Sequence, residues 1–146
     1  MKFSFNLEPL LDYRKRLEEL SKKDFAEAAA QLREEEERLV GLRRTYREAS
    51  EEVDELKTSG RTHELGLYAA YLARLKTTIA GQEKAIEEAR GELERRRGEL
   101  LEATKEKKVV EVMRERSFEA FRKRERRRDQ KETDELATTR FKRSGT

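Results

Sequence analysis

The sequence predicts an all-α fold: a long antiparallel two-helix coiled-coil hairpin with an extended second helix. Charged residues make up 46% of the 146 residues and apolar residues only 34%, too few apolar residues for a compact globule of this size. The strong helix formers Glu, Lys, Arg, Ala, Leu and Gln dominate, and the one proline is Pro9. Apolar residues also recur at coiled-coil spacing in two segments that a turn separates.

The first helix is predicted over residues 7 to 57. From residue 25 onward, alternating spacings of three and four select a seam that is apolar except at Glu35. Its members are Phe25, Ala28, Leu32, Glu35, Leu39, Leu42, Tyr46, Ala49, Val53 and Leu56. Upstream, the same spacing selects Leu10, Tyr13, Leu17 and Leu20, one residue out of register. The seam is therefore expected to shift between residues 21 and 24.

A turn is predicted over residues 58 to 63, within the stretch KTSGRTH. Gly60 can adopt the left-handed conformation that ends a helix. Thr62 is a candidate cap for the helix that follows.

The second helix is predicted over residues 64 to 136. Its seam is mostly apolar and weakens after Val110. The positions are Leu65, Tyr68, Leu72, Leu75, Ile79, Gln82, Ile86, Ala89, Leu93, Arg96, Leu100, Ala103, Lys107 and Val110. The two helices would be roughly 75 Å and 110 Å long. The second therefore overshoots the first by about 20 residues. Residues 137 to 146 are expected to form a frayed tail, and residues 1 to 146 a single coiled-coil domain.

Two polar residues interrupt the apolar seams at matching distances from the turn. Glu35 and Gln82 lie at similar distances from the turn, so they should face each other. A hydrogen bond between them would set the register of the two helices, as buried polar residues do in coiled coils. A looser region that accepts a partner is the alternative, which we favour less.

Residues that carry catalysis are scarce. There is no cysteine, and the single histidine, His63, lies in the turn. The usual zinc ligand sets are therefore excluded, and no nucleotide-binding glycine motif is present. A two-helix hairpin also lacks a cleft that would shift carboxylate pKa values. We expect no enzymatic activity, no catalytic residues, no metal and no cofactor.

The sequence shows no secretory leader and no apolar run of roughly 20 residues. We therefore expect no transmembrane segment and a cytoplasmic location.

Residues 118 to 136, FEAFRKRERRRDQKETDEL, carry the densest basic run, with seven Arg or Lys in the first fourteen positions. Nucleic acid, a membrane surface and a protein partner are three candidate ligands. Glu119, Glu125 and Asp129 dilute the positive charge, and no aromatic residue alternates with the arginines for base stacking. Only Phe118 and Phe121 could anchor a membrane helix. A protein partner is favoured, and a basic arm that binds nucleic acid is the alternative.

The two ends of the chain carry short sequence motifs. The first end reads FSFNLEPLLDYR (residues 3 to 14) and the second RDQKETDELA (128 to 137). YAAYLARL (68 to 75) and IAGQE (79 to 83) lie between them. Together these stretches resemble the FliJ family of bacterial flagellar export proteins, and the resemblance covers nearly the whole chain. It implies a coiled coil that is similar to the central stalk subunit of rotary ATPases.

The resemblance also implies partners in flagellar type III secretion. The end at which the termini meet would bind the hexameric export ATPase and promote its assembly and activity. The coil would also contact the cytoplasmic domain of the export gate protein and bind export chaperones, at the cytoplasmic face of the inner membrane.

These expectations identify two sets of candidate residues. The predicted ATPase-binding set combines motif positions that the resemblance implies with three arginines chosen for their charge. Its members are Leu7, Leu10, Leu11, Arg14, Arg126, Arg127, Arg128, Gln130, Lys131, Asp134 and Glu135. The predicted gate-binding set is Leu39, Leu42, Tyr46, Tyr71, Leu75 and Gln82. Several members of the second set are also seam residues.

Overall fold

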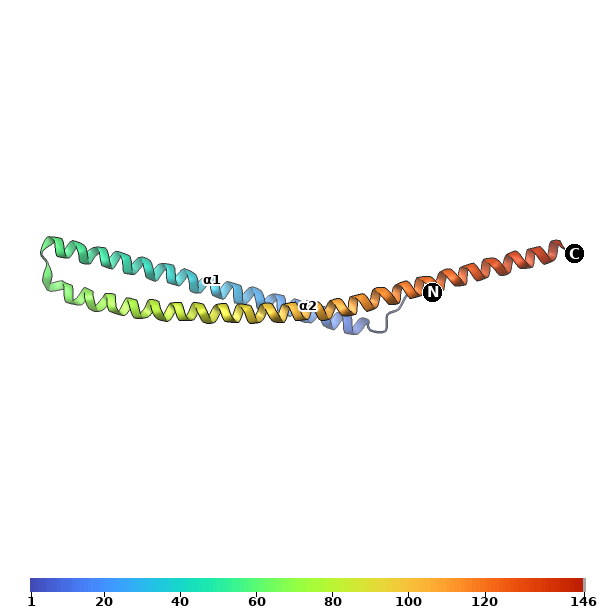
Figure 1. Cartoon of the computed structure of the whole chain (residues 1–146), viewed down its shortest axis with the longest axis horizontal. Helices are drawn as coiled ribbons and strands as arrows, with labels where there is room; N and C mark the ends of the chain where they lie inside the picture. Colours follow the sequence, from blue (N-terminus) through green and yellow to red (C-terminus); the bar gives the residue numbers. More distant parts are fainter. Residues whose placement is uncertain (146) are drawn as a thin grey trace. The chain divides into compact units, whose positions relative to one another are not determined.

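The computed structural model describes residues 1–145 and is an all-α helical hairpin (Figure 1). Helix α1 spans Glu8–Ser59, the short 3-10 helix η1 spans Thr62–Glu64, and helix α2 spans Leu65–Ser144. The two long helices contain 52 and 80 residues. The predicted fold class is therefore confirmed, including the longer second helix.

The chain divides into two compact units. The turn unit is Leu20–Leu101. The terminal unit combines Met1–Glu19 with the part of α2 from Glu102 onward.

The turn unit contains the link between α1 and α2. Gly60 adopts a positive φ of 79°, the left-handed conformation expected of it. The backbone N–H of Arg61 donates to the Leu56 carbonyl oxygen at 3.1 Å and closes the end of α1. Thr62 begins η1 instead of capping α2 directly, so α2 starts at Leu65.

From Phe25 onward, every predicted seam position of the turn unit is buried or half-buried. The most enclosed apolar members are Ala28, Leu39, Ala49, Leu75 and Ile86. The spacings of three and four therefore identified the faces through which the two helices pack in this unit.

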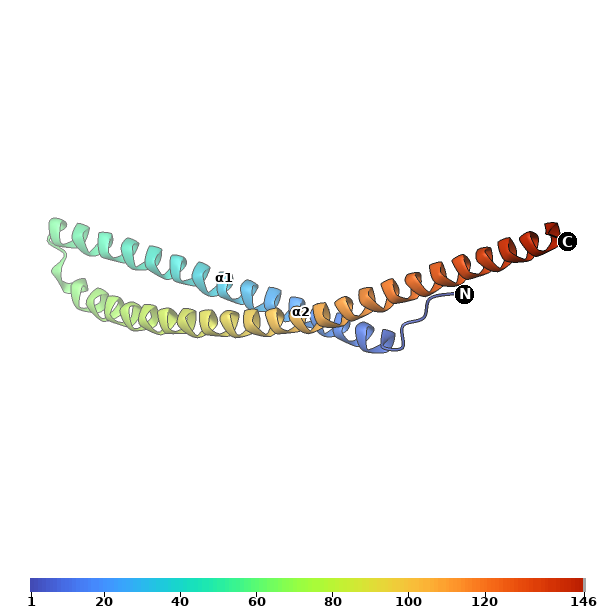
Figure 2. The same ribbon diagram turned by 45° about the vertical axis from the view of Figure 1, so that its right-hand side comes forward.

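The terminal unit has a separate apolar core. Phe5, Leu11 and Val110 are buried together, with Phe3, Leu7 and Leu10 packed around them. Residues 1 to 7 precede α1 and follow the surface of α2 in both views (Figure 2). We call residues 1 to 7 the N-terminal strap. The strap marks the point at which pairing between the N-terminal part of the chain and α2 ends.

The ring of Phe3 attaches the strap to α2. Its centroid lies 5.1 Å from that of Phe118 and 5.5 Å from that of Phe121. The Arg114 guanidinium lies 5.5 Å from the Phe3 ring centre, a cation–π contact. The two phenylalanines at the start of the basic run thus have a structural role.

The expected shift of the seam between residues 21 and 24 is wrong. Tyr13 and Leu20 are 53% and 55% exposed. The register of Phe25 continues upstream without a break, through Ser21, Glu18 and Arg14 to Leu11 and Leu7, all of them buried or half-buried. The burial of the charged members is tolerated because side chains of α2 form ion pairs with them. Arg14 Nη1 lies 2.6 Å from Glu106 Oε2, and Lys107 Nζ lies 2.9 Å from Glu18 Oε1.

The expected frayed tail from residue 137 is helical as far as Ser144. No glycine or proline occurs between Gly98 and Gly145, so no residue breaks the helix earlier. Gly145 donates its backbone N–H to the Phe141 carbonyl oxygen at 3.0 Å. The last tail residue, Thr146, lies outside the described residues.

Among residues 1–145, no helix has a stretch both long and apolar enough to cross a lipid bilayer.

Candidate protein-binding site

The most accessible candidate surface is the α2 overhang, residues 122–144, which follows the last strap contact at Phe121. Every residue of the overhang is exposed except Glu125, which is half-buried. Its polar contacts are local: Arg128 pairs with Glu125 at 2.9 Å and Gln130 donates to Asp134 at 3.1 Å. Its helix is therefore not stabilised by tertiary packing, and isolated helices of this kind are marginal in water.

The predicted ATPase-binding residues of α2 all lie on this overhang and are all exposed. They are Arg126, Arg127, Arg128, Gln130, Lys131, Asp134 and Glu135. Within residues 1–145, Arg126, Arg127, Lys131 and Glu135 have no side-chain hydrogen bond or ion pair. Their charges are free to meet those of another molecule.

The predicted ATPase-binding residues of the strap and α1 already have contacts within the chain. Leu11 is only 2% exposed, and Leu7 and Leu10 pack against the same core. Arg14 is held by Glu106. Leu10 and Arg14 are half-buried, so part of each side chain reaches the surface.

The structure does not bring the two halves of this predicted set together. Leu11 packs with Val110, which lies twenty residues before Gln130 on one continuous helix. At 1.5 Å per residue, that separation is about 30 Å. A partner that contacts both groups would need to extend along this whole length of α2.

The predicted gate-binding set is mostly inside the seam. Leu39 and Leu75 are each 8% exposed, and Leu42, Tyr46 and Gln82 are half-buried. Tyr71 alone among the six is exposed, at 38%. Tyr71 is therefore the member of this set with the largest accessible surface for a partner.

Glu35 and Gln82 face each other, as their equal distances from the turn predict. Gln82 Nε2 donates to the Glu35 carboxylate and also to its backbone carbonyl oxygen, at 2.9 Å for the latter. Gln31 and Arg38 donate to the other carboxylate oxygen at 2.9 Å and 3.2 Å. Each polar group of this buried site is satisfied, which favours a register-setting role over an open partner site.

The sequence interpretation missed one exposed apolar side chain near the turn. Leu67 is 77% exposed and lines a surface pocket with Tyr68, Tyr71, Arg74 and Glu52. Tyr68 donates its hydroxyl to Glu52 at 2.7 Å, and this hydrogen bond raises the pKa of Tyr68 above its usual value. Leu67 lies four residues before Tyr71, and both lie one position off the seam. That spacing was the sequence signal that could have identified Leu67 as part of the same surface.

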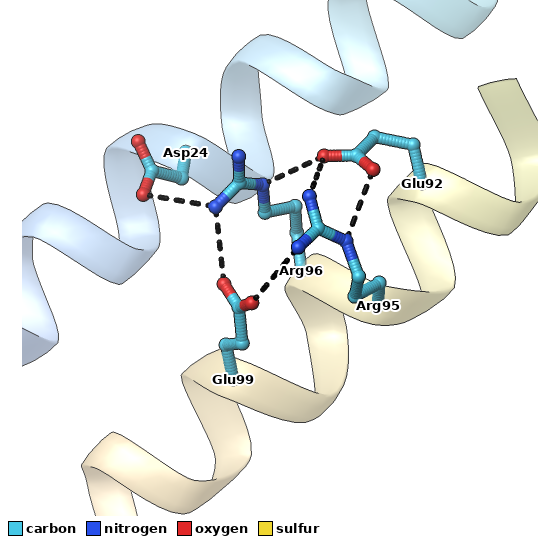
Figure 3. A network of polar contacts seen from close by, with 5 residues as sticks. All are labelled: Asp24, Glu92, Arg95, Arg96 and Glu99. Carbon is cyan, nitrogen blue, oxygen red and sulfur yellow. Dashed lines mark hydrogen bonds and ion pairs between the residues drawn. The ribbon is translucent and has the colours of Figure 1, made fainter.

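A charge network surrounds Arg96, another polar seam residue of the turn unit (Figure 3). Arg96 contacts Glu92 at 2.9 Å, Glu99 at 3.1 Å and Asp24 of α1 at 3.5 Å. Arg95 pairs with Glu92 at 2.7 Å and holds the pKa of that carboxyl below its usual value. Hydrogen bonding to Glu99 raises the pKa of Arg96. The network compensates a charged residue in the seam, so we assign it a structural role.

No group of three or more metal-ligating side chains occurs in the part of the chain that the structure describes. What the described residues offer instead is exposed helical surface, at the overhang and beside Tyr71.

The family model of the flagellar FliJ protein matches residues 2–146, nearly the full chain. The chain belongs to the FliJ family. FliJ proteins are non-catalytic components of the bacterial flagellar export apparatus. The resemblance at the two ends is thereby confirmed over the whole length, and with it a role in flagellum biogenesis and protein export. No match was found among curated proteins or solved structures.

Proposed function

We propose that this FliJ protein is a stalk-like adaptor of the export apparatus. Its terminal unit binds the hexameric export ATPase and promotes ring assembly and hydrolysis. The coil links that ring to the export gate and to export chaperones, in the cytoplasm at the inner membrane.

The observation that carries this proposal is the α2 overhang. It is a helix of more than twenty residues in which every side chain except that of Glu125 is exposed. Burial against a partner would stabilise it far more than helix propensity alone. Arg126, Arg127 and Lys131 supply unpaired positive charge, and Asp134 and Glu135 follow with negative charge. This distribution suits a protein surface with both signs of charge.

The strap and α1 residues of the predicted set have a second role under this proposal. Leu7 and Leu11 hold the terminal unit together, and Leu10 and Arg14 present only part of their side chains. We assign direct contact to the overhang, and positioning to Leu7 and Leu11.

The test is a charge reversal on the overhang. We expect Arg126→Glu, Arg127→Glu and Arg128→Glu together to reduce ATPase stimulation and ring assembly by about tenfold or more, since attraction becomes repulsion. The measurement combines phosphate release by the cognate ATPase with sedimentation of the assembled ring, at increasing concentrations of the adaptor.

The matched control is Arg33→Glu, Arg44→Glu and Arg47→Glu, which makes the same change in net charge on exposed positions of α1. Stimulation by this control should equal that of the unaltered protein, and both variants should retain helicity by circular dichroism. Equal losses in the two variants would contradict a docking role for the overhang. So would salt-sensitive RNA binding by the unaltered protein without any effect on the ATPase.

For the gate contact we propose Tyr71, with Leu67 and Arg74 beside it. Exposed tyrosine contributes strongly to protein interfaces because it buries a large area at low entropic cost. Tyr71→Ala should weaken binding to the gate's cytoplasmic domain by about tenfold. Tyr13→Ala removes a tyrosine of the terminal unit that is more exposed, 53% against 38%, and serves as control. Equal effects of the two substitutions in a binding titration would remove Tyr71 from the site.

A further inference from the structure

A second surface of the terminal unit lies one residue off the seam of α2. Alternating spacings of four and three define the apolar-basic stripe: Val109, Met113, Arg116, Ala120, Lys123 and Arg127. Residues at this spacing share one face of an α-helix. All six are exposed. The stripe is apolar at its start and basic at its end.

The apolar part of the stripe is unusually open for such side chains. Val109 is 61% exposed and Met113 is 42% exposed, although Val110 beside them is buried in the core. Seam packing therefore does not account for either residue.

Tyr13 of α1 lies on the same side of the terminal unit. The Arg14 guanidinium bonds Glu106 at 2.6 Å and also lies 5.8 Å from the Tyr13 ring centre. Glu106 precedes Val109 by one helical turn on the same face. Tyr13, which is 53% exposed, thus adds to the apolar start of the stripe from the neighbouring helix.

The basic part of the stripe carries uncompensated charge. Within residues 1–145, Arg116, Lys123 and Arg127 form no ion pair. The nearby carboxylates of Glu119 and Glu125 are paired with other arginines, at 3.6 Å and 2.9 Å. Glu115 and Glu119 line the shallow depression that also includes Arg116, Ala120 and Lys123. The net charge of the stripe remains positive.

The N-terminal strap leaves this face open. Phe3 covers α2 at Phe118, Phe121 and Arg114. In the helical projection these three positions lie roughly opposite Arg116, Ala120 and Lys123. The strap and the stripe therefore occupy different sides of α2.

We propose that the apolar-basic stripe docks an acidic amphipathic helix of another protein. Apolar side chains of that helix cover Val109, Met113 and Tyr13, in the manner of a third helix added to a two-helix coil. Its carboxylates align with Arg116, Lys123 and Arg127 farther along α2. This contact shares Arg127 with the ATPase contact proposed above, but its apolar part, Val109 and Met113, begins before the overhang, and the variants that test it leave Arg127 unchanged.

The two other classes of ligand fit the stripe less well. A nucleic acid would use the basic half, but Val109 and Met113 would give it nothing to bind. A membrane would need apolar anchors throughout the stripe, and Ala120 is the one apolar residue of its basic half.

The test uses a designed helical peptide of about 20 residues, with leucines on one half of a face and glutamates on the other half. Its binding to the full-length protein is followed by fluorescence anisotropy at low and high salt. A scrambled peptide of the same composition is the first control. Arg116→Glu with Lys123→Glu should weaken binding about tenfold and remove most of its salt dependence. Val109→Ser with Met113→Ser should weaken it comparably and leave the salt dependence in place.

The matched protein control is Lys108→Glu with Arg140→Glu, which makes the same change in net charge at exposed positions outside the stripe. Its affinity should stay within about twofold of the unaltered protein. Arg116→Gln with Lys123→Gln repeats the charge test without introducing acidic residues, and circular dichroism checks the fold of each variant. The proposal is overturned if the scrambled peptide binds equally well, or if the control loses as much affinity. Tighter binding of duplex RNA or of anionic phospholipid vesicles than of the peptide would also overturn it.

Discussion

Glu18 and Lys107 form an ion pair of 2.9 Å at facing positions of the coiled-coil seam. Their side chains are 6% and 21% exposed, so both charges are largely removed from water. A coiled coil usually places apolar side chains at such positions. Glu111 lies 3.7 Å from Lys107 and adds a second carboxylate to the site.

Removal of one member of this pair should destabilise the terminal unit. We expect Glu18→Leu to lower the free energy of unfolding by about 1–3 kcal/mol, because Lys107 stays half-buried and loses the carboxylate of Glu18. The double variant Glu18→Leu with Lys107→Leu should regain the lost stability or become more stable than the unaltered protein, since two leucines pack well at a seam. Urea unfolding followed by circular dichroism measures both. A double variant no more stable than the single variant would contradict this account.

The pair of Glu35 and Gln82 should control register more than stability. Gln82→Leu should cost about 1–2 kcal/mol, because the Glu35 carboxylate loses its donor from α2. Glu35→Leu with Gln82→Leu should restore stability and permit shifted alignments of the helices.

Introduced cysteines can report that register, since the chain contains none. Ala28 and Ala89 lie one heptad from Glu35 and Gln82, respectively, toward the open end of the hairpin. Oxidation of Ala28→Cys with Ala89→Cys should give one dominant disulfide in the natural background and a lower yield in the double-leucine background. Equal yields in the two backgrounds would rule out a register role for the polar pair.

The strap contact of Phe3 should protect α2 locally. Phe3→Ala removes two aromatic contacts and a cation–π contact, worth about 1–3 kcal/mol together. Hydrogen exchange should accelerate in the α2 segment around residues 114 to 121 and stay unchanged near residues 75 to 86. Phe141→Ala, at an aromatic residue that is 78% exposed, is the matched control and should alter neither segment. Unchanged exchange around 114 to 121 in Phe3→Ala would show that the strap does not stabilise α2.

The Glu92 carboxylate should make the turn unit sensitive to acid. Hydrogen bonding to Arg95 lowers the pKa of Glu92 in the folded state below its usual value of 4.5. A group with a lowered folded pKa adds stability above its unfolded pKa, and that stability is lost as the pH falls through the folded pKa. Glu92→Gln should therefore melt at a lower temperature than the unaltered protein at neutral pH.

The melting difference caused by Glu92→Gln should shrink and then disappear as the pH falls below 4.5 and through the lowered folded pKa of Glu92, because the carboxyl then becomes protonated. High salt should also shrink it, because the network lies near the surface. Glu88→Gln removes an exposed carboxylate that has no ion pair within residues 1–145, and it should show no such pH dependence. A difference that persisted unchanged at low pH would exclude the ionic origin.

Most of the hairpin could be predicted because its periodicity is strong. From Phe25 to Leu56, and through the matching segment of α2, the apolar spacing leaves one choice of buried face. The turn at Gly60 followed from a local backbone requirement that glycine meets at little cost. The match of Glu35 to Gln82 followed from equal distances to that turn.

The candidate site was harder to predict, because exposure depends on how much of each helix the other covers. Leu39 and Leu75 were expected from the family resemblance to contact the export gate and are buried, whereas Leu67 was not in the predicted set and is exposed. The position of Phe3 on Phe118 and Phe121 also depends on the path of a non-helical segment, which has no periodicity to indicate it.

The sequence by itself determined two long helices, their turn and their register from residue 25 onward, because helix propensity and spacing act locally. Only the tertiary structure decided which face of α1 is buried before residue 21. The apolar pattern favoured Tyr13 and Leu20, but α1 continues as one helix through residue 21 and keeps the buried face of Phe25. Arg14 and Glu18 therefore enter the seam. Glu106 and Lys107, more than eighty residues away in sequence, make that burial tolerable by supplying the opposite charges.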